Sequence, residues 1–236
     1  MIPRIIHYCW FGHNPKPKLI LNCIDSWHRL CPDWEIIEWN EDNYDVLASE
    51  YTKAAYEDKN WAYVADYARF DVLYKQGGVY FDTDVELLRP IPDELMREEA
   101  FTGFETPSKV APGLVFGTTP GQGFLREVLD NYSSKRYSTN ETVVDIITKL
   151  LEKHGLVGDN SEQTVCGVKI MPTEYFGCFN HEIQAFEKTS NTISLHHYYA
   201  SWRPWYSKTK FRIIKHVAKL LGKEKYLRLK HFIKRK

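Results

Sequence analysis

Two carboxylates, Asp82 and Asp84, follow a short apolar run in the stretch GGVYFDTDV, residues 77–85. In an extended chain, side chains two residues apart point to the same face, so we expect both carboxylates to converge on one spot. Like charges held that close repel, which indicates a positive group between them. Carboxylate oxygens are the hard ligands that Mg²⁺ and Mn²⁺ prefer, so the pair predicts a divalent-cation site. The alternative is that Asp-Thr-Asp only ends a strand and begins a turn.

A second charged pair, Asp66 and Arg69, lies before this stretch, in the segment that Gly77-Gly78 ends. Residues three apart on a helix are neighbours on its surface, so the two side chains are expected to meet. Close to a Gly-Gly turn and the two aspartates, such a pair predicts a hydrogen-bonding fork for hydroxyl groups. The alternative is an ordinary surface ion pair, worth well under ~1 kcal/mol.

The densest cluster of chemically versatile side chains is HHYYASWRPW, residues 196–205. An imidazole from His196 or His197 suits Mn²⁺ as a further ligand, and the planar fork of Arg203 suits phosphate oxygens. The alternative is an aromatic-rich loop that packs on the core. Trp10, at the end of the first apolar run, has the π-face needed to stack on a nucleobase, although such an indole also suits a core.

The elements that must position these residues can be predicted from apolar periodicity. We expect a helix over residues 61–76, because Val64, Ala68 and Val72 recur at helical spacing and Gly77-Gly78 ends the pattern. The other expected strands cover residues 4–11, 34–39, 79–81, 101–105 and 113–118, and the other expected helices cover 19–30, 123–132 and 141–153. Residues 168–172 and 192–202 are expected as strand or loop. Strand, helix and strand at the start of a chain indicate an α/β nucleotide-binding fold, whose ligands bind at the carboxyl ends of the strands.

Charge is unevenly distributed along the 236 residues, although the formal net charge is zero. Residues 208–236 hold 12 of the 31 Lys and Arg residues and one acid, Glu224, so this tail carries +11 and residues 1–207 carry −11. The tail also has two apolar stripes at helical spacing. Basic amphipathic helices bind anionic membrane surfaces, which predicts a membrane-surface anchor at 208–236. The alternative is a helical pair that packs on the acidic body.

Composition restricts the remaining classes. A hydrophobic share of 43% and a charged share of 26% are typical of one globular domain, and zero net charge disfavours a general nucleic-acid binder. Five cysteines without a C-x-x-C pair predict reduced structural thiols. The first residues lack the apolar core of a signal peptide, so the expected location is cytoplasmic.

Three segments together resemble the family 32 glycosyltransferases, the D-x-D sugar transferases that include bacterial polysaccharide enzymes and fungal mannosyltransferases. The segments, in chain order, are IPRIIHYCWFG, AYVADYARFDVLYKQGGVYFDTDVELLRPI and LHHYYASW. The helix-to-D-x-D block also resembles the catalytic domains of the large glucosylating toxins. The resemblance implies a GT-A fold over residues 1–207, with a mixed, mostly parallel central sheet, followed by the basic helical tail.

The resemblance further implies a role for individual residues. Asp66 and Arg69 match the pair that holds the donor sugar, and Asp82 and Asp84 match the D-x-D that binds Mn²⁺ or Mg²⁺. The expected nucleotide contacts are Trp10 on the base, Trp202 near the diphosphate and Arg203 on phosphate. His197 matches a metal-binding histidine of the related family 8 enzymes, and His196 competes for that role.

The implied function is a retaining, metal-dependent transferase that moves a sugar from a nucleotide donor to a glycan or lipid-linked glycan in surface polysaccharide synthesis. A UDP-sugar is the first expectation for the donor and GDP-mannose the second. The expected place of action is the cytoplasmic face of the membrane, with the tail as the peripheral anchor. Two alternatives stay open, namely a metal-dependent phosphohydrolase and a non-catalytic membrane-surface adaptor.

Overall fold

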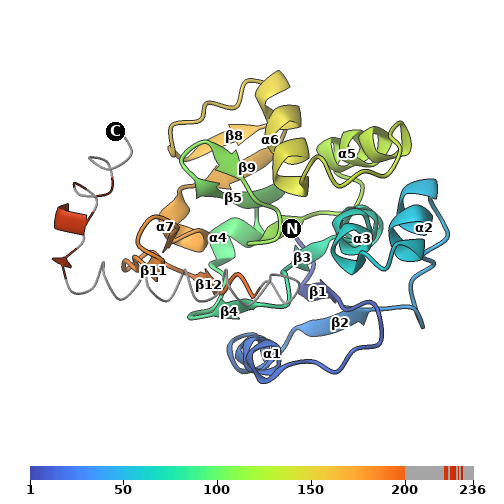
Figure 1. Cartoon of the computed structure of the whole chain (residues 1–236), viewed down its shortest axis with the longest axis horizontal. Coiled ribbons are helices and arrows are strands. Elements are labelled where there is room, and N and C mark those ends of the chain that lie inside the picture. Colours follow the sequence, from blue (N-terminus) through green and yellow to red (C-terminus); the bar gives the residue numbers. More distant parts are fainter. Residues whose placement is uncertain (200–220, 223, 227, 229, 231–236) are drawn as a thin grey trace.

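A mixed β-sheet with helices on both faces forms the body of the protein (Figure 1). The computed structural model describes residues 1–199, 221–222, 224–226, 228 and 230. Within those residues the main sheet has eight strands, in the order β2-β1-β3-β7-β5-β9-β8, with β6 paired to β5. The strands are β1 Ile5–Cys9, β2 Glu35–Trp39, β3 Gly78–Tyr80, β5 Ala100–Thr106, β6 Lys109–Val110, β7 Phe116–Thr118, β8 Gln163–Val165 and β9 Val168–Met171.

Most strands of this sheet run in one direction. β1 is parallel to both β2 and β3, and β5 is parallel to β9. β7 is antiparallel to β3 and to β5, so β5 and β9 run in the same direction as the first three strands. The expected α/β fold with a mixed and mostly parallel sheet is confirmed.

Two hydrophobic clusters cover the two faces of the sheet. One is formed with α2 Glu50–Glu57, α3 Trp61–Gln76, α5 Gly123–Ser133 and α6 Val143–Lys153. The other is formed with α1 Lys18–Leu30, α4 Asp93–Met96 and α7 Thr173–Phe176. Figure 1 shows α2, α3 and α5 side by side on their flank of the sheet. In β1, Ile6 and Tyr8 pack with Trp27 of α1, whereas Cys9 packs on the α3 side, as expected for alternating side chains.

Helix α3 is the element that positions much of the site, and it has the predicted bounds. It lies between α2 and α5, so it buries Asp66, Arg69 and Asp71 as well as its apolar residues. It ends at Gly77, which has a φ of 68° and donates its N–H to the Leu73 carbonyl at 2.8 Å. Gly78 follows with a φ of 99°, and a side chain there would meet the His7 ring. Two glycines are therefore required for the turn into β3.

Two small antiparallel sheets lie beside the main one. β4 Val85–Leu87 pairs with β12 Ser194–His196, and β10 Phe179–Asn180 pairs with β11 Ala185–Phe186. The pairing of β4 with β12 is important for the site because β4 directly follows the two aspartates. It brings the end of the described body next to them, with His196 opposite Val85.

The predicted elements are largely confirmed. Residues 113–115 are not strand, and only Phe116–Thr118 of that segment pairs in the sheet. Within residues 192–199, expected as strand or loop, the strand is Ser194–His196. Helix α2, which Ser49 caps by accepting the Thr52 N–H, was not predicted. Residues 200–220 and most of the basic tail lie outside the described residues. In the described part of the chain, no helix has the length and apolar character needed to cross a bilayer.

Candidate active site

The loop after β3 carries Asp82 and Asp84 at the carboxyl end of that strand. Asp82 donates its N–H to the Gly113 carbonyl at 2.9 Å, and Val85 donates its N–H back to the Asp82 carbonyl at 3.0 Å. Residues 82–85 thus form a turn, and the expectation of an extended chain here was wrong. The turn gives the two carboxylates different partners, so they are not aligned by strand alternation.

Asp82 is held by a buried cation and a phenol. The Arg69 guanidinium lies 3.3 Å from Asp82 Oδ1, and the Tyr80 hydroxyl donates to the same oxygen at 3.1 Å. The guanidinium also lies over the Tyr80 ring, 4.7 Å from its centroid. The other carboxylate oxygen, Oδ2, lies against Gly113, where a Cβ would come within 2.0 Å of it. Asp82 is therefore fixed from three sides.

Asp66 and Arg69 form a buried ion pair, with Arg69 Nη2 2.7 Å from Asp66 Oδ1. Asp66 is 8% exposed and Arg69 is 3% exposed, so the alternative of a surface ion pair was wrong. Burial raises the pKa of Asp66 to about 6, although Arg69 opposes the shift. Burial acts to lower the pKa of Arg69, but Asp82, Tyr80 and Asp66 outweigh it and keep the guanidinium charged. The second guanidinium nitrogen, Nη1, is buried without a hydrogen-bond partner among the described residues, so it is a spare donor beside Asp82.

Asp84 is held by the segment that follows β12. Its Oδ1 lies 2.9 Å from His196 Nε2, and its Oδ2 accepts the Tyr199 N–H at 2.6 Å. Burial acts to lower the pKa of His196, but Asp84 and then Asp82 raise it to about 9. His196 in turn helps to lower the pKa of Asp84 against the effect of burial. An imidazolium beside Asp84 and a guanidinium beside Asp82 are the positive groups that the two neighbouring carboxylates require.

His197 is placed differently from the sequence-based expectation. Its Nε2 lies 2.9 Å from Glu86 Oε2, and its ring packs edge-to-face against Phe186. Its backbone N–H donates to the Asp84 carbonyl. The structure thus brings His196, and not the side chain of His197, to the Asp84 carboxylate. The described residues contain no group of three or more His, Cys, Asp or Glu side chains arranged to hold a metal ion.

A divalent cation still fits the donor set of Asp82 and Asp84. Mg²⁺ in particular is usually bound through one or two carboxylates, with waters and substrate phosphates as its other ligands, so a three-ligand protein cage is not required. The two aspartates belong to one turn at the end of β3, and Asp82 presents Oδ2 with no hydrogen bond to any described residue. Asp82 and Asp84 are therefore the residues that would hold such an ion.

Trp10 follows β1 at the same edge of the sheet. Its backbone N–H donates to the Trp39 carbonyl at 2.8 Å, which places it beside the end of β2. Its indole N–H donates to the Asn14 carbonyl at 2.6 Å, and Lys16 lies over the ring, 5.6 Å from the centroid. The ring is partly exposed. Trp202 and Arg203 lie outside the described residues, so their expected roles stay predictions.

Two residues of the site were not predicted. Tyr80 occupies the position two before Asp82, so its place at the end of a strand was a signal that was available. Gly113 gave no such signal, because its role comes from the return of a distant loop onto Asp82.

Residues 17–102 match the family described as glycosyltransferase sugar-binding region containing DXD motif, a span that includes Asp66, Arg69, Asp82 and Asp84. Over these residues the chain is similar to the DXD glycosyltransferase region. The match supports the prediction of a glycosyltransferase.

Similar proteins carry glycosyltransferase names. Inositol phosphoceramide mannosyltransferase 3 of Schizosaccharomyces pombe is 30% identical over 164 residues, which cover 62% of this chain and 44% of that protein. Human alpha-1,4-N-acetylglucosaminyltransferase is 35% identical over 106 residues, which cover 44% of this chain and 26% of that protein. The chain therefore spans less than half the length of these curated relatives.

One solved structure similar to this chain is a glycosyltransferase involved in the glycosylation of the major capsid of PBCV-1. The match has a TM-score of 0.48 and 9% identity, and it covers 84% of this chain and 95% of the other.

Proposed function

We propose that this protein is a retaining, metal-dependent glycosyltransferase that moves a sugar from a nucleotide-sugar donor to a glycan or a lipid-linked acceptor. The observation that carries the proposal is the chain of contacts from the buried pair Asp66 and Arg69 to the partly exposed Asp82, which lies within the matched DXD region and ends beside Asp84. A buried, paired guanidinium with one unused donor is rare in a merely structural role, and it suits the hydroxyls of a sugar.

Five residues of the site have distinct roles in this function. Asp66 and Arg69 orient the donor sugar, because together they offer acceptor oxygens and a donor nitrogen at one place. Asp82 is shared between the sugar and the metal, and Asp84 is the direct metal ligand. Trp10 supports the nucleobase at the neighbouring strand end. A divalent cation held by the aspartates would neutralise the charge that develops on the departing diphosphate.

In the proposal, His196 takes the place beside Asp84 that was expected for His197, as the positive partner of that carboxylate and not as a metal ligand, because an imidazolium has no nitrogen lone pair to offer. His196 contacts the Asp84 carboxylate, whereas the ring of His197 contacts Glu86. A retaining mechanism with front-face attack by the acceptor hydroxyl is consistent with a site whose carboxylates are all engaged by cations or hydrogen bonds. In that mechanism the leaving phosphate accepts the proton of the attacking hydroxyl.

The names of the relatives bear on the transferred sugar. Three of them are mannosyltransferases or a mannosyl phosphorylinositol ceramide synthase, and one is an N-acetylglucosaminyltransferase. Both GDP-mannose and UDP-sugars are therefore proposed donors. A lipid-linked acceptor in surface polysaccharide synthesis is our proposal for the acceptor.

The basic tail is proposed to hold the enzyme at an anionic membrane, at the cytoplasmic face. The charge of +11 in residues 208–236 supports this, since each Lys or Arg near such a surface adds about 1 kcal/mol. One described tail residue, Lys230, lies 3.3 Å from Glu182 of the body, which supports the alternative of a tail packed on the protein. Cosedimentation with phosphatidylserine vesicles, before and after removal of residues 208–236, separates the two. Equal sedimentation of both forms would rule out the anchor.

A thermal-shift screen tests the transferase proposal. UDP-glucose, UDP-N-acetylglucosamine and GDP-mannose are each added with Mn²⁺ or with EDTA. A donor at about 100 times its Kd should raise Tm by about 5–10 °C with Mn²⁺ and by much less with EDTA. The proposal fails if no nucleotide sugar stabilises the protein, or if the metal makes no difference to the shift.

A further inference from the structure

Five tyrosines gather around Asp66, on the side of α3 that faces α2 and the loop between α5 and α6. Their rings form a continuous set of contacts, with centroid distances of 4.8 Å from Tyr51 to Tyr132 and 5.6 Å from Tyr63 to Tyr137. Tyr51 joins the two pairs, since it also contacts Tyr137 at 5.6 Å. Tyr67 completes the cluster through Tyr51 and Tyr132. The negative charge of Asp66 contributes to raising the pKa of Tyr51, Tyr63 and Tyr132 in addition to their burial.

The cluster has a buried base and a partly exposed rim. Tyr51 and Tyr132 are 6% and 1% exposed, so they form the base with the core beneath. Tyr63 and Tyr137 are only partly buried and form the rim. Tyr63 lies one turn before Asp66 on α3, so the rim begins beside the proposed donor-sugar site. Tyr63 and Tyr137 are therefore the rings of the cluster that a ligand can contact from solvent.

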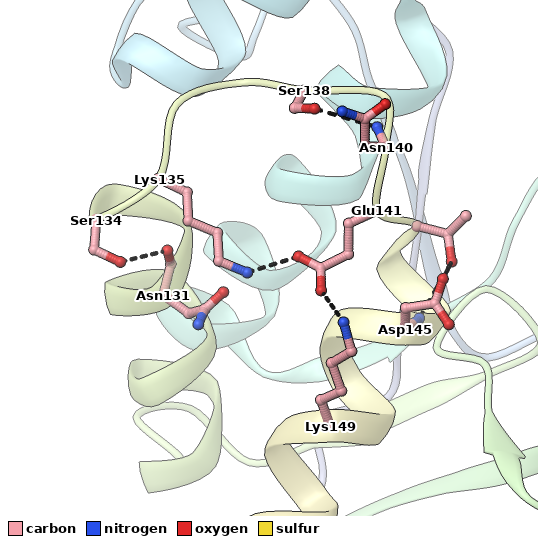
Figure 2. A network of polar contacts seen from close by, with 9 residues as sticks. Asn131, Ser134, Lys135, Ser138, Asn140, Glu141, Asp145 and Lys149 are labelled. Atoms are coloured by element: carbon pink, nitrogen blue, oxygen red, sulfur yellow. Dashed lines mark hydrogen bonds and ion pairs between the residues drawn. The ribbon is translucent and has the colours of Figure 1, made fainter.

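The rim is held in place by polar contacts from two directions. The amide of Asn60, directly before α3, donates to the Tyr137 hydroxyl at 2.9 Å, and the Tyr63 hydroxyl of α3 donates to the Thr139 carbonyl at 3.2 Å. From the outside, Glu141 accepts from Lys135 at 2.7 Å and from Lys149 at 2.6 Å. Figure 2 shows Glu141 between these two lysines, where the loop from α5 turns into α6. The two lysines also lower the pKa of Glu141.

These contacts hold the loop between α5 and α6 in a defined position, so that it forms one wall of the proposed site. Thr142 caps α6 by accepting the Asp145 N–H at 3.2 Å, which fixes the C-terminal end of the loop. Asn60 and Glu141 fix its middle and its end, so the Tyr137 ring has a defined orientation before any ligand binds. A preorganised ring loses little entropy when it contacts a ligand.

The tyrosine side chains of this wall are complementary to a sugar ring. Tyrosine offers an aromatic face for the C–H face of a pyranose and a hydroxyl for hydrogen bonding, at low entropic cost. A purely apolar ligand would find hydroxyls and the Asp66 carboxylate, and a phosphate would be repelled by that carboxylate. A neutral, hydroxylated ring fits all three features.

We propose that Tyr63 and Tyr137 form a subsite for the neutral carbohydrate or cyclitol ring of the acceptor, placed beside Asp66 and held in position by Glu141. The proposal rests on the transferase function proposed above, because it makes the acceptor meet the donor sugar at Asp66. It adds the acceptor class and the residues that recognise it.

The test separates acceptor binding from nucleotide binding. Methyl α-mannoside, methyl β-galactoside, methyl N-acetylglucosaminide and myo-inositol are titrated into the full chain by saturation-transfer NMR, with Mn²⁺ and either UDP or GDP present. At least one ring compound should bind, and Tyr137→Ala and Tyr63→Ala should weaken its binding by about tenfold. Glu141→Gln should weaken it less, through a looser loop. None of the three substitutions should change the Kd of the nucleotide.

Two controls keep the test decisive. Tyr137→Phe keeps the ring and removes only the hydroxyl, so it should retain most of the binding even if the alanine variant is unstable. Tyr74→Ala, at the other end of α3, where Tyr74 contacts Arg126, should have no effect on ring binding. The subsite is overturned if no ring compound binds while nucleotide does, or if Tyr137→Ala and Tyr63→Ala bind it as well as the unchanged protein. Absence of nucleotide binding in every form would instead overturn the transferase function.

Discussion

His196 Nε2 lies 2.9 Å from Asp84 Oδ1, although 112 positions separate the two residues in the sequence. The contact exists because β12 pairs with β4, which places His196 opposite Val85. The turn that carries the aspartates is thereby closed by the last strand of the described body. The D-x-D region can be complete only when this distant segment has folded back onto it.

Asp84→Asn should reduce turnover of the nucleotide sugar by about 100-fold or more, because a neutral amide is a poor ligand for a divalent cation and no longer supplies charge. The amide oxygen can still accept a hydrogen bond, so the loss of stability should be only about 1–3 kcal/mol. Product formation and Tm, measured with and without Mn²⁺, check both expectations.

Glu86→Gln is the matched control for this change. Glu86 lies two residues further along and pairs with His197 in the way that Asp84 pairs with His196. The control should retain activity, since Glu86 is not placed at the proposed metal site. Equal activity of Asp84→Asn and Glu86→Gln would contradict the assignment of Asp84.

Arg69→Ala should destabilise the protein by about 3–5 kcal/mol, because it leaves Asp66 and Asp82 without their shared cation. Arg69→Lys keeps the charge but loses the planar fork that contacts two carboxylates at once. The lysine variant should therefore fold and bind the donor more weakly by about tenfold or more. Urea unfolding and donor titration by calorimetry separate the two effects. Donor affinity at the original level in Arg69→Lys would show that the fork is not used.

The fold could be predicted from the sequence wherever the local sequence of an element determines its structure. Residues 61–76 form the predicted helix with the same ends, because helical periodicity and two glycines both act locally. The buried state of Asp66 and Arg69 could not be read in this way. It depends on α2 and α5, which cover α3 from both sides, and α2 itself was not predicted.

The same distinction applies to the site. The residue types of the aspartates and histidines predicted a divalent-cation site, and the family resemblance of the segments that carry them implied a transferase, with which the matched DXD region agrees. The choice between His196 and His197 depends on the register of β12 against β4, because adjacent residues of a strand point to opposite faces. A shift of one residue would exchange them. Sequence spacing carries no information on that register.

Gly113→Ala should impair donor binding through Asp82. The new Cβ would lie 2.0 Å from Asp82 Oδ2 and 3.2 Å from Arg69 Nη1, so the carboxylate must move. We expect the KM for the donor to rise by about tenfold or more, with a loss of stability of about 1–3 kcal/mol. Steady-state kinetics and urea unfolding provide the measurements.

Gly123→Ala is the control, because it adds a methyl group at the start of α5 where no atom lies within 4 Å. Alanine in a helix is favoured over glycine by about 0.5–1 kcal/mol, so this variant should be slightly more stable and fully active. An unchanged donor KM in Gly113→Ala would mean that Asp82 can move without loss of donor binding.

His7 should make the stability of the protein depend on pH. Its Nε2 lies 2.8 Å from the Gly77 carbonyl, and its Nδ1 accepts from the Trp39 indole N–H at 3.1 Å, so the ring is neutral with its proton on Nε2. Burial lowers the pKa of His7 to about 4, although the bond to Gly77 opposes the shift. The unfolded chain takes up this proton near pH 6.5, before the folded protein does. The stability that the neutral His7 ring provides is therefore complete above pH 6.5, and about 3 kcal/mol of it is lost as the pH falls from there to 4.

Urea unfolding at pH 7, 6 and 5 tests this expectation. The loss of stability between pH 7 and 5 should be smaller in His7→Gln, whereas His28→Gln, at an exposed position of α1, should behave as the original protein. If His7→Gln loses as much stability between pH 7 and 5 as the original protein, His7 does not resist protonation in the folded state.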